Sequence, residues 1–174
     1  GSAAAVRLHP PLSGTQSIFD YRIDPAGQRV CFRVVLVAGG KLALFSAPLD
    51  GSAAPTWLNL DPPARGSVGT FAFDPQGARV VFTSHVDSED VNALFQVPTD
   101  GSSLPVSLTP AGISSVSTEL FVGGGVVVYR GDDALYWVPI EGGASQLLTP
   151  PAPTGTALWR FTQQGPTPLV DGRV

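Results

Sequence analysis

The chain has 174 residues, enough for one hydrophobic core or barely two. Its 20 Gly and 17 Pro exceed a fifth of the residues, so a helical protein is excluded and short elements joined by turns are expected. Only ten residues are basic and the net charge is −4, which excludes a nucleic-acid-binding surface. No run of 18 apolar residues predicts a membrane span, and the lone Cys31 excludes a disulfide framework.

Three short signatures recur along the chain in the same order. The first, Asp24–Phe32, returns fifty residues later as Asp74–Phe82. The second recurs as Leu44–Gly51, Leu94–Gly101 and Leu135–Gly142, and the third as Leu60-Asp61-Pro62, Leu108-Thr109-Pro110 and Leu148-Thr149-Pro150. A further copy of the third signature, Leu8-His9-Pro10, stands alone near the N-terminus. Such periodicity is typical of repeat proteins.

Each repeat unit resolves into four short strands. In the middle unit these are Thr70–Phe73, Ala78–Thr83, Ala93–Pro98 and Val106–Thr109, and the Asp-Pro-x-Gly turn that begins at Asp74 joins the first two. Four antiparallel strands in 41 to 50 residues match the size of one propeller blade. The sequence therefore predicts an all-β domain over residues 1–174. We expect full blades at about 19–62, 70–110 and 119–150, and a partial blade shared by residues 6–10 and 157–174.

These signatures resemble the blade repeat of TolB-like β-propellers, a WD-type repeat family, over about residues 7–151. The order Asp-Pro-x-Gly-x-Arg-Val-x-Phe, then Leu-Phe-x-Val-Pro-x-Asp-Gly, then Leu-Thr-Pro carries the resemblance. The third unit lacks the Asp-Pro turn, and Gly123-Gly124-Gly125 predicts a shorter glycine hairpin there rather than a phosphate-binding loop.

The ends of the repeat array predict self-association. The strand Val6–His9 carries the closing signature of a blade, and Leu158–Phe161 reads as the opening strand of one. Unpaired strand edges favour pairing, which could occur within one chain or between two copies, and we favour two copies.

Acidic and histidine side chains do not predict a metal or catalytic site. His85, Asp87, Glu89 and Asp90 share one loop, but their spacing lacks the features of a Ca²⁺-binding loop, and a solvated hairpin tip is the simpler interpretation. The same holds for Asp132-Asp133. The only other histidine is His9, and no Gly-x-Ser-x-Gly elbow occurs. We therefore assign no catalytic, cofactor-binding or metal-binding residue, and expect no cofactor.

The remaining conspicuous residues are explained by packing. Cys31 lies in an apolar strand and is expected to be a buried, unreactive thiol. The Asp24/Arg29 and Asp74/Arg79 pairs are expected to form local charge pairs across hairpins. Alternating positions favour core packing over a sugar-binding surface for the aromatic residues Trp57, Trp137, Trp159, Tyr21, Tyr129 and Tyr136.

The resemblance implies a non-catalytic scaffold that binds another protein, in the periplasm or outside the cell. Two alternatives remain open. The chain could be the gating propeller of a prolyl-oligopeptidase-type hydrolase whose catalytic domain is absent from this sequence, or a carbohydrate-binding propeller that uses its tryptophans. In all three cases neither nucleic acid binding nor membrane insertion is expected.

Overall fold

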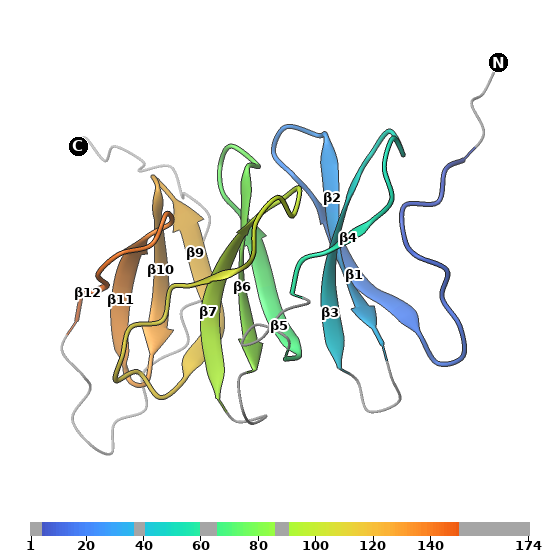
Figure 1. Cartoon of the computed structure of the whole chain (residues 1–174). Coiled ribbons are helices and arrows are strands. Elements are labelled where there is room, and N and C mark those ends of the chain that lie inside the picture. The colour runs from blue at the N-terminus through green and yellow to red at the C-terminus, as the bar shows by residue number, and fades with distance from the viewer. Residues whose placement is uncertain (1–4, 37–40, 60–65, 86–90, 150–174) are drawn as a thin grey trace, which may run out of the picture.

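The computed structural model describes residues 5–36, 41–59, 66–85 and 91–149, which form three four-stranded antiparallel sheets and no helix (Figure 1). The first sheet holds β1 (Ser17–Ile23), β2 (Arg29–Val35), β3 (Leu42–Pro48) and β4 (Thr56–Trp57). The second holds β5 (Val68–Phe73), β6 (Arg79–His85), β7 (Asn92–Pro98) and β8 (Val106–Ser107). The third holds β9 (Val116–Gly123), β10 (Val126–Gly131), β11 (Ala134–Pro139) and β12 (Gln146–Leu147). The predicted all-β class and the three four-stranded units are confirmed.

The unit boundaries differ from the prediction by a few residues. Each first strand begins two or three residues earlier than expected, because β1, β5 and β9 extend beyond the apolar residues that mark them in the sequence. Each fourth strand has only two residues. The three sheets therefore span 17–57, 68–107 and 116–147.

A carboxylate shapes the turn between the first two strands of a unit. One oxygen of Asp24 accepts the amides of Gln28 (2.7 Å) and Arg29 (2.9 Å), and Gly27 takes a positive φ of 67°. In the second sheet Asp74 likewise accepts the amide of Arg79 (2.9 Å), and Gly77 takes a positive φ of 74°. The predicted charge pair of Asp24 with Arg29 is wrong, because the carboxylate is occupied by backbone amides and Arg29 Nε donates to Ser46 Oγ (3.0 Å).

The third sheet replaces this turn by a glycine hairpin, as predicted. Gly124 and Gly125, with φ of 59° and 76°, form a two-residue connection between β9 and β10. Two consecutive positive φ angles are typical of the type I′ turn, whose twist matches that of the strands it joins.

The third signature, Leu-Thr-Pro, fixes the fourth strand of a unit to its third strand. Thr109 Oγ1 accepts the amide of Leu94 (2.7 Å), and Thr149 Oγ1 accepts that of Leu135 (3.0 Å). In the first sheet Asn59 Oδ1 accepts the amide of Leu44 (2.8 Å). The predicted Leu60-Asp61-Pro62 lies outside the described residues, and Leu58-Asn59 occupies the equivalent place. The prediction was two residues off because an asparagine oxygen replaces the threonine hydroxyl.

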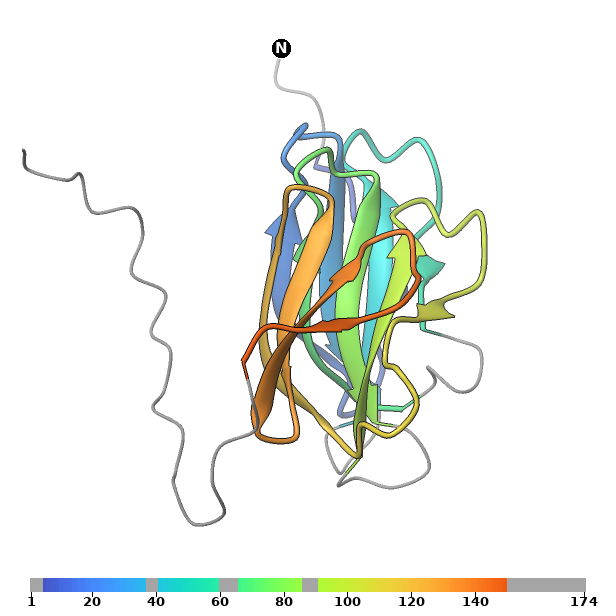
Figure 2. The ribbon, with the colours of Figure 1, turned by 90° about the vertical axis from the view of Figure 1, so that its left-hand side faces the viewer.

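The sheets stack face to face, and Figure 2 shows them one behind another. Successive residues of a strand point to opposite faces, so the second sheet buries apolar side chains on both sides. One core cluster includes Cys31, Leu44 and Leu58 of the first sheet and Val68, Phe71 and Phe82 of the second. The other includes Val81, Leu94 and Leu108 of the second sheet and Val116, Val127 and Tyr129 of the third.

The N-terminal segment lies against the outer face of the first sheet. Leu8 and Leu12 pack on a third cluster that includes Phe32 and Phe45. A methyl group on Gly51 would overlap the Val6 side chain, just as one on Gly101, fifty residues later, would overlap Thr56 of β4. Val6–His9 thus takes the position of a fourth strand that precedes the first sheet. The residues expected to share that blade, 157–174, lie outside the described residues.

Candidate binding surfaces

Each sheet has two faces, which we name by the direction of the chain. The leading face points toward the preceding unit and carries Val30 and Phe32 in the first sheet. The trailing face points toward the following unit and carries Cys31. At the first junction, Cys31 and Leu44 of the trailing face pack into the cluster that contains Phe71. The junction between sheets is therefore a repeated interface, whose chemistry can be compared from unit to unit.

A buried arginine clamps the first junction. Arg33 is 9% exposed and forms a bidentate ion pair with Asp20 (Nε–Oδ1 2.8 Å, Nη2–Oδ2 2.5 Å). Its Nη1 also donates to the backbone carbonyls of Val68 and Gly69 in the second sheet. Arg33 and Arg22 both lie over the ring of Phe71, with centroid distances of 5.8 and 5.4 Å. The guanidinium thus pairs with a carboxylate of its own sheet and, through Nη1, hydrogen-bonds the backbone of the second sheet.

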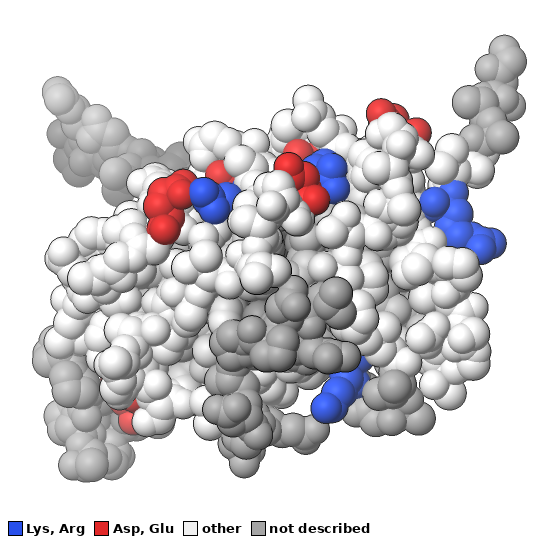
Figure 3. All heavy atoms as spheres, in the orientation of Figure 1, with Lys and Arg blue, Asp and Glu red and all other residues white. Residues whose placement is uncertain are grey.

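A row of charged turns links the sheets at one end. Arg79 of the second sheet forms two hydrogen bonds to Glu141 of the third, Nε–Oε1 3.1 Å and Nη2–Oε2 2.5 Å. At the first junction, hydrogen bonds from Ser102 lower the pKa of Asp100, and the positive charge of Arg29 lowers it further. Figure 3 shows basic and acidic side chains side by side along this edge. The arginine of one unit therefore faces the acidic turn of the next.

The leading face of the first sheet carries an open apolar groove of about 350 Å³. The groove separates the N-terminal segment from β1. Tyr21 is 67% exposed, whereas Phe71, at the same position in the second sheet, is 1% exposed. Ile18 is 36% exposed, and its equivalent Val68 is fully buried. The lining residues are Leu8, His9, Ile18, Tyr21, Ile23, Val30, Phe32 and Leu49.

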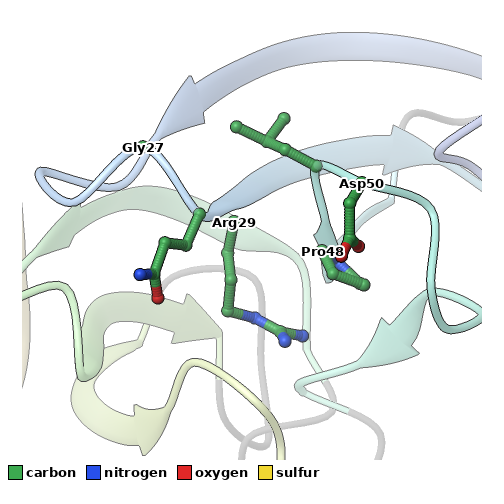
Figure 4. Close-up of a pocket in the computed structure, with 6 residues that line it drawn as sticks. Gly27, Arg29, Pro48 and Asp50 are labelled. Atoms are coloured by element: carbon green, nitrogen blue, oxygen red, sulfur yellow. The ribbon is translucent and has the colours of Figure 1, made fainter.

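A second hollow, of about 640 Å³, lies at the turn end of the first sheet. Figure 4 shows Gly27, Arg29, Pro48 and Asp50 around it. Among the described residues, a methyl group at Gly27 would meet nothing within 4 Å, whereas one at Gly77 would stand 2.8 Å from a carboxylate oxygen of Asp24. Hydrogen bonds from Ser52 lower the pKa of Asp50, which is thus a charged acceptor at neutral pH. At the equivalent positions of the second sheet, side chains of the first sheet occupy the space that is hollow here.

The trailing face of the third sheet is also open among the described residues. Phe121 is 57% exposed and lies opposite Val128, which in turn lies opposite Trp137. Leu148 is 51% exposed, although its equivalents Leu58 and Leu108 are buried. This face presents aromatic and aliphatic side chains to solvent.

The acidic residues around His85 and at Asp132-Asp133, which were not expected to bind metal, are only partly covered by the described residues. No group of three His, Cys, Asp or Glu side chains gathers in the described part of the chain. His85 ends β6, and Asp87, Glu89 and Asp90 lie outside the described residues. Asp132 is not a free hairpin tip, because its carboxylate accepts the amides of Ser114 and Ser115 and it adopts a positive φ of 48°.

Of the packing predictions for single residues, those for Cys31, Trp57 and Tyr129 are confirmed and that for Tyr21 is wrong. Cys31 is fully buried, and burial raises the pKa of its thiol to about 12 despite a hydrogen bond with Ser46. Trp57 and Tyr129 are packed as predicted, stacked on neighbouring rings. Tyr21 was wrongly placed in the core. The sequence offered no signal for this difference, because Tyr21 and Phe71 occupy the same repeat position.

The groove and the hollow on the first sheet offer contacts through which another protein could bind. The groove offers apolar contact, Val6–His9, which the structure does not assign as a strand, lies where β4 lies at the next junction, and Asp50 offers one charge. The described residues include no helix able to cross a membrane.

Comparison with known proteins places this arrangement in a fold class. Three four-stranded antiparallel sheets stacked in chain order form a TolB-like fold, because the chain is similar to a candidate TolB protein of known structure from Agrobacterium tumefaciens. The TM-score is 0.52 at 17% sequence identity, over 74% of this chain and 48% of that one. This chain thus matches about half of that protein's length. No protein-family profile and no curated protein sequence matches it.

Proposed function

We propose that the chain is a TolB-like β-propeller scaffold that binds another protein and performs no catalysis. The observation that carries the proposal is the leading face of the first sheet, where Ile18, Tyr21 and Ile23 are exposed along the groove that Leu8 and His9 also line. Contiguous exposed apolar surface with defined shape is typical of interaction sites. We name these residues, together with Val6–His9, the docking face.

Two further observations support a scaffold over the alternatives. The thiol of Cys31, with a pKa of about 12, stays protonated at neutral pH and is a poor nucleophile. Trp57 stacks on Phe45, and its Nε1 donates to Asn59 (2.7 Å), so its ring serves packing rather than sugar stacking. The gating propeller of a hydrolase remains the second candidate, and a hydrolase domain on the same polypeptide would favour it.

A periplasmic or extracellular setting is part of the proposal and is supported by the resemblance of the repeats to TolB-like propellers. Cell fractionation with an antibody against this chain tests it. Recovery with cytoplasmic markers would contradict the setting without affecting the docking face.

The binding function is tested by affinity capture from envelope extracts of the source cells, with quantitative mass spectrometry. We expect one or a few proteins to be enriched by the wild-type chain and lost with Tyr21→Asp. Leu104→Asp is the matched control, because Leu104 is equally exposed (66%) but lies outside the docking face. Enrichment that survives Tyr21→Asp would exclude this face as the binding site, and no enrichment at all would contradict a scaffold role.

A further inference from the structure

The junction between the first and second sheets is a template for what the docking face recognises. At that junction Asp24 fits against Gly77, and at the next junction Arg79, the equivalent of Arg29, hydrogen-bonds Glu141, which stands at the position of Asp100. Cys31 and Leu44 fill the apolar space in front of Phe71. The first sheet thus offers the second an acidic turn, an arginine and two apolar side chains of modest size.

The same receiving positions recur on the first sheet fifty residues earlier. Gly27 corresponds to Gly77, Asp50 to Asp100 and Tyr21 to Phe71. All three positions are open among the described residues: nothing lies close to Gly27, Asp50 is fully exposed, and Tyr21 borders the groove. Within the described part of the chain, the receiving half of a sheet junction is therefore present without its complement.

We propose that the docking face binds a β-sheet of a protein partner that carries an Asp-Pro-x-Gly-x-Arg hairpin and two modest apolar side chains behind it. The partner's aspartate would lie against Gly27, its arginine would pair with Asp50, and its apolar side chains would cover Tyr21. This inference rests on the proposed function, since it specifies the partner class of the same face.

The Val6–His9 segment of the docking face fits the same partner. In the first sheet, Thr56 and Trp57 of β4 pair with Ser46 and Phe45 of β3. Val6–His9 lies where such a fourth strand would lie, although the structure assigns no strand to it, so this segment is placed to pair with the third strand of the incoming sheet. Backbone pairing gives affinity, and the turn and groove give selectivity.

A second copy of this chain is a poorer occupant. Its open face is the trailing face of the third sheet, where Val126 takes the position of Arg29: each lies opposite the proline that ends the third strand. The Asp-Pro turn is also missing there. The third sheet therefore offers neither the aspartate for Gly27 nor the arginine for Asp50.

A tandem chain supplies the proposed partner sheet in known register. Residues 1–65 followed by residues 16–174 place an added first sheet before the original one, in the fifty-residue repeat. The probe is a thiol introduced by Tyr21→Cys in the original sheet, with Cys31→Ala in both sheets. We expect its labelling rate to fall at least tenfold in the tandem chain relative to the natural chain carrying the same substitutions.

Charge reversal tests the turn contact. Arg29→Asp in the added sheet, or Asp50→Arg in the original sheet, is expected to restore labelling several-fold, and the two together to protect the thiol again. Asp50→Arg in the natural chain, which lacks the added sheet and its Arg29, serves as the control and should not change labelling. Unchanged labelling in the tandem chain, failure of that chain to fold, or charge reversals without effect would each overturn the proposal.

Two outcomes separate the competing occupants. Protection of the thiol in the natural chain at high concentration, abolished by Phe121→Asp, would make a second copy the occupant and overturn the proposal. The tandem chain with Tyr21→Asp in its added sheet should also lose the protein captured from envelope extracts, because the substitution disables the docking face of the added sheet and the added sheet covers the original one. If it loses that protein although charge reversal has no effect, the docking face stands and the stated partner chemistry fails.

Discussion

Thr109→Val removes the acceptor that fastens β8 to β7 and keeps the volume of the side chain. Thr109 Oγ1 accepts the amide of Leu94 at 2.7 Å, and Leu94 is fully buried in the second core cluster. Leaving a buried amide unpaired costs about 1–3 kcal/mol. For a domain of this size, each kcal/mol lowers Tm by about 2–4 °C, so we expect a loss of about 2–12 °C.

Thr149→Val is the matched control, because Thr149 accepts the amide of Leu135 in the same way but at an exposed site. Water replaces the lost acceptor there, so the expected change is within about 0.5 kcal/mol. Thr109→Asn should recover part of the loss, since Asn59 performs the same role in the first sheet. Urea unfolding followed by circular dichroism, with m-values checked for constancy, measures all three variants. Equal losses at positions 109 and 149 would refute the reasoning.

The remaining predictions concern the junctions and the buried thiol. Gly77→Ala should destabilise the chain by about 1 kcal/mol more than Gly27→Ala. A positive φ strains an alanine at both positions, but only the methyl group at position 77 meets the Asp24 carboxylate. Equal losses of stability in thermal melts would contradict this. Arg33→Met should cost about 2 kcal/mol or more in urea unfolding, because it leaves a carboxylate and two carbonyls of the junction without their donor. The pKa of the Cys31 thiol is about 12 in the folded chain but about 9 when the chain is unfolded. The contribution of the neutral thiol to the free energy of unfolding is therefore complete below pH 9 and is lost as the pH rises toward 12. Between pH 8 and 10.5 the wild-type chain should therefore lose stability relative to Cys31→Ala, and parallel pH profiles would contradict the burial of the thiol.

The docking face also bears on folding cooperativity. In stacked repeats, each unit is stabilised by its own pairing and by the interface with its neighbours. The second sheet has both faces covered, and its central strands β6 and β7 are buried over five consecutive residues each. The first sheet has one face covered only in part, so β1 is expected to exchange its amide hydrogens faster than β5.

The recurring signatures by themselves determined the number of units, the four strands of each and the turns between them. These features are local: an Asp-Pro-x-Gly segment builds the same turn at Asp24 and Asp74, and two consecutive glycines build the hairpin after Gly123. Sequence and structure agree on the order of the strands and on the turns between the first two strands, because the contacts that determine them lie within one unit.

Tertiary structure decided the properties that depend on a neighbouring sheet. Tyr21 and Phe71 share one repeat position, yet only Phe71 has a sheet packed in front of it and is buried. Arg79 pairs with Glu141, 62 residues away, rather than with Asp74, because the hairpin amides already occupy the Asp74 carboxylate and the acidic turn of the next sheet lies within reach. Alternation along a strand shows that a side chain points to one face of its sheet, but only the packing of sheets shows whether that face meets protein or solvent.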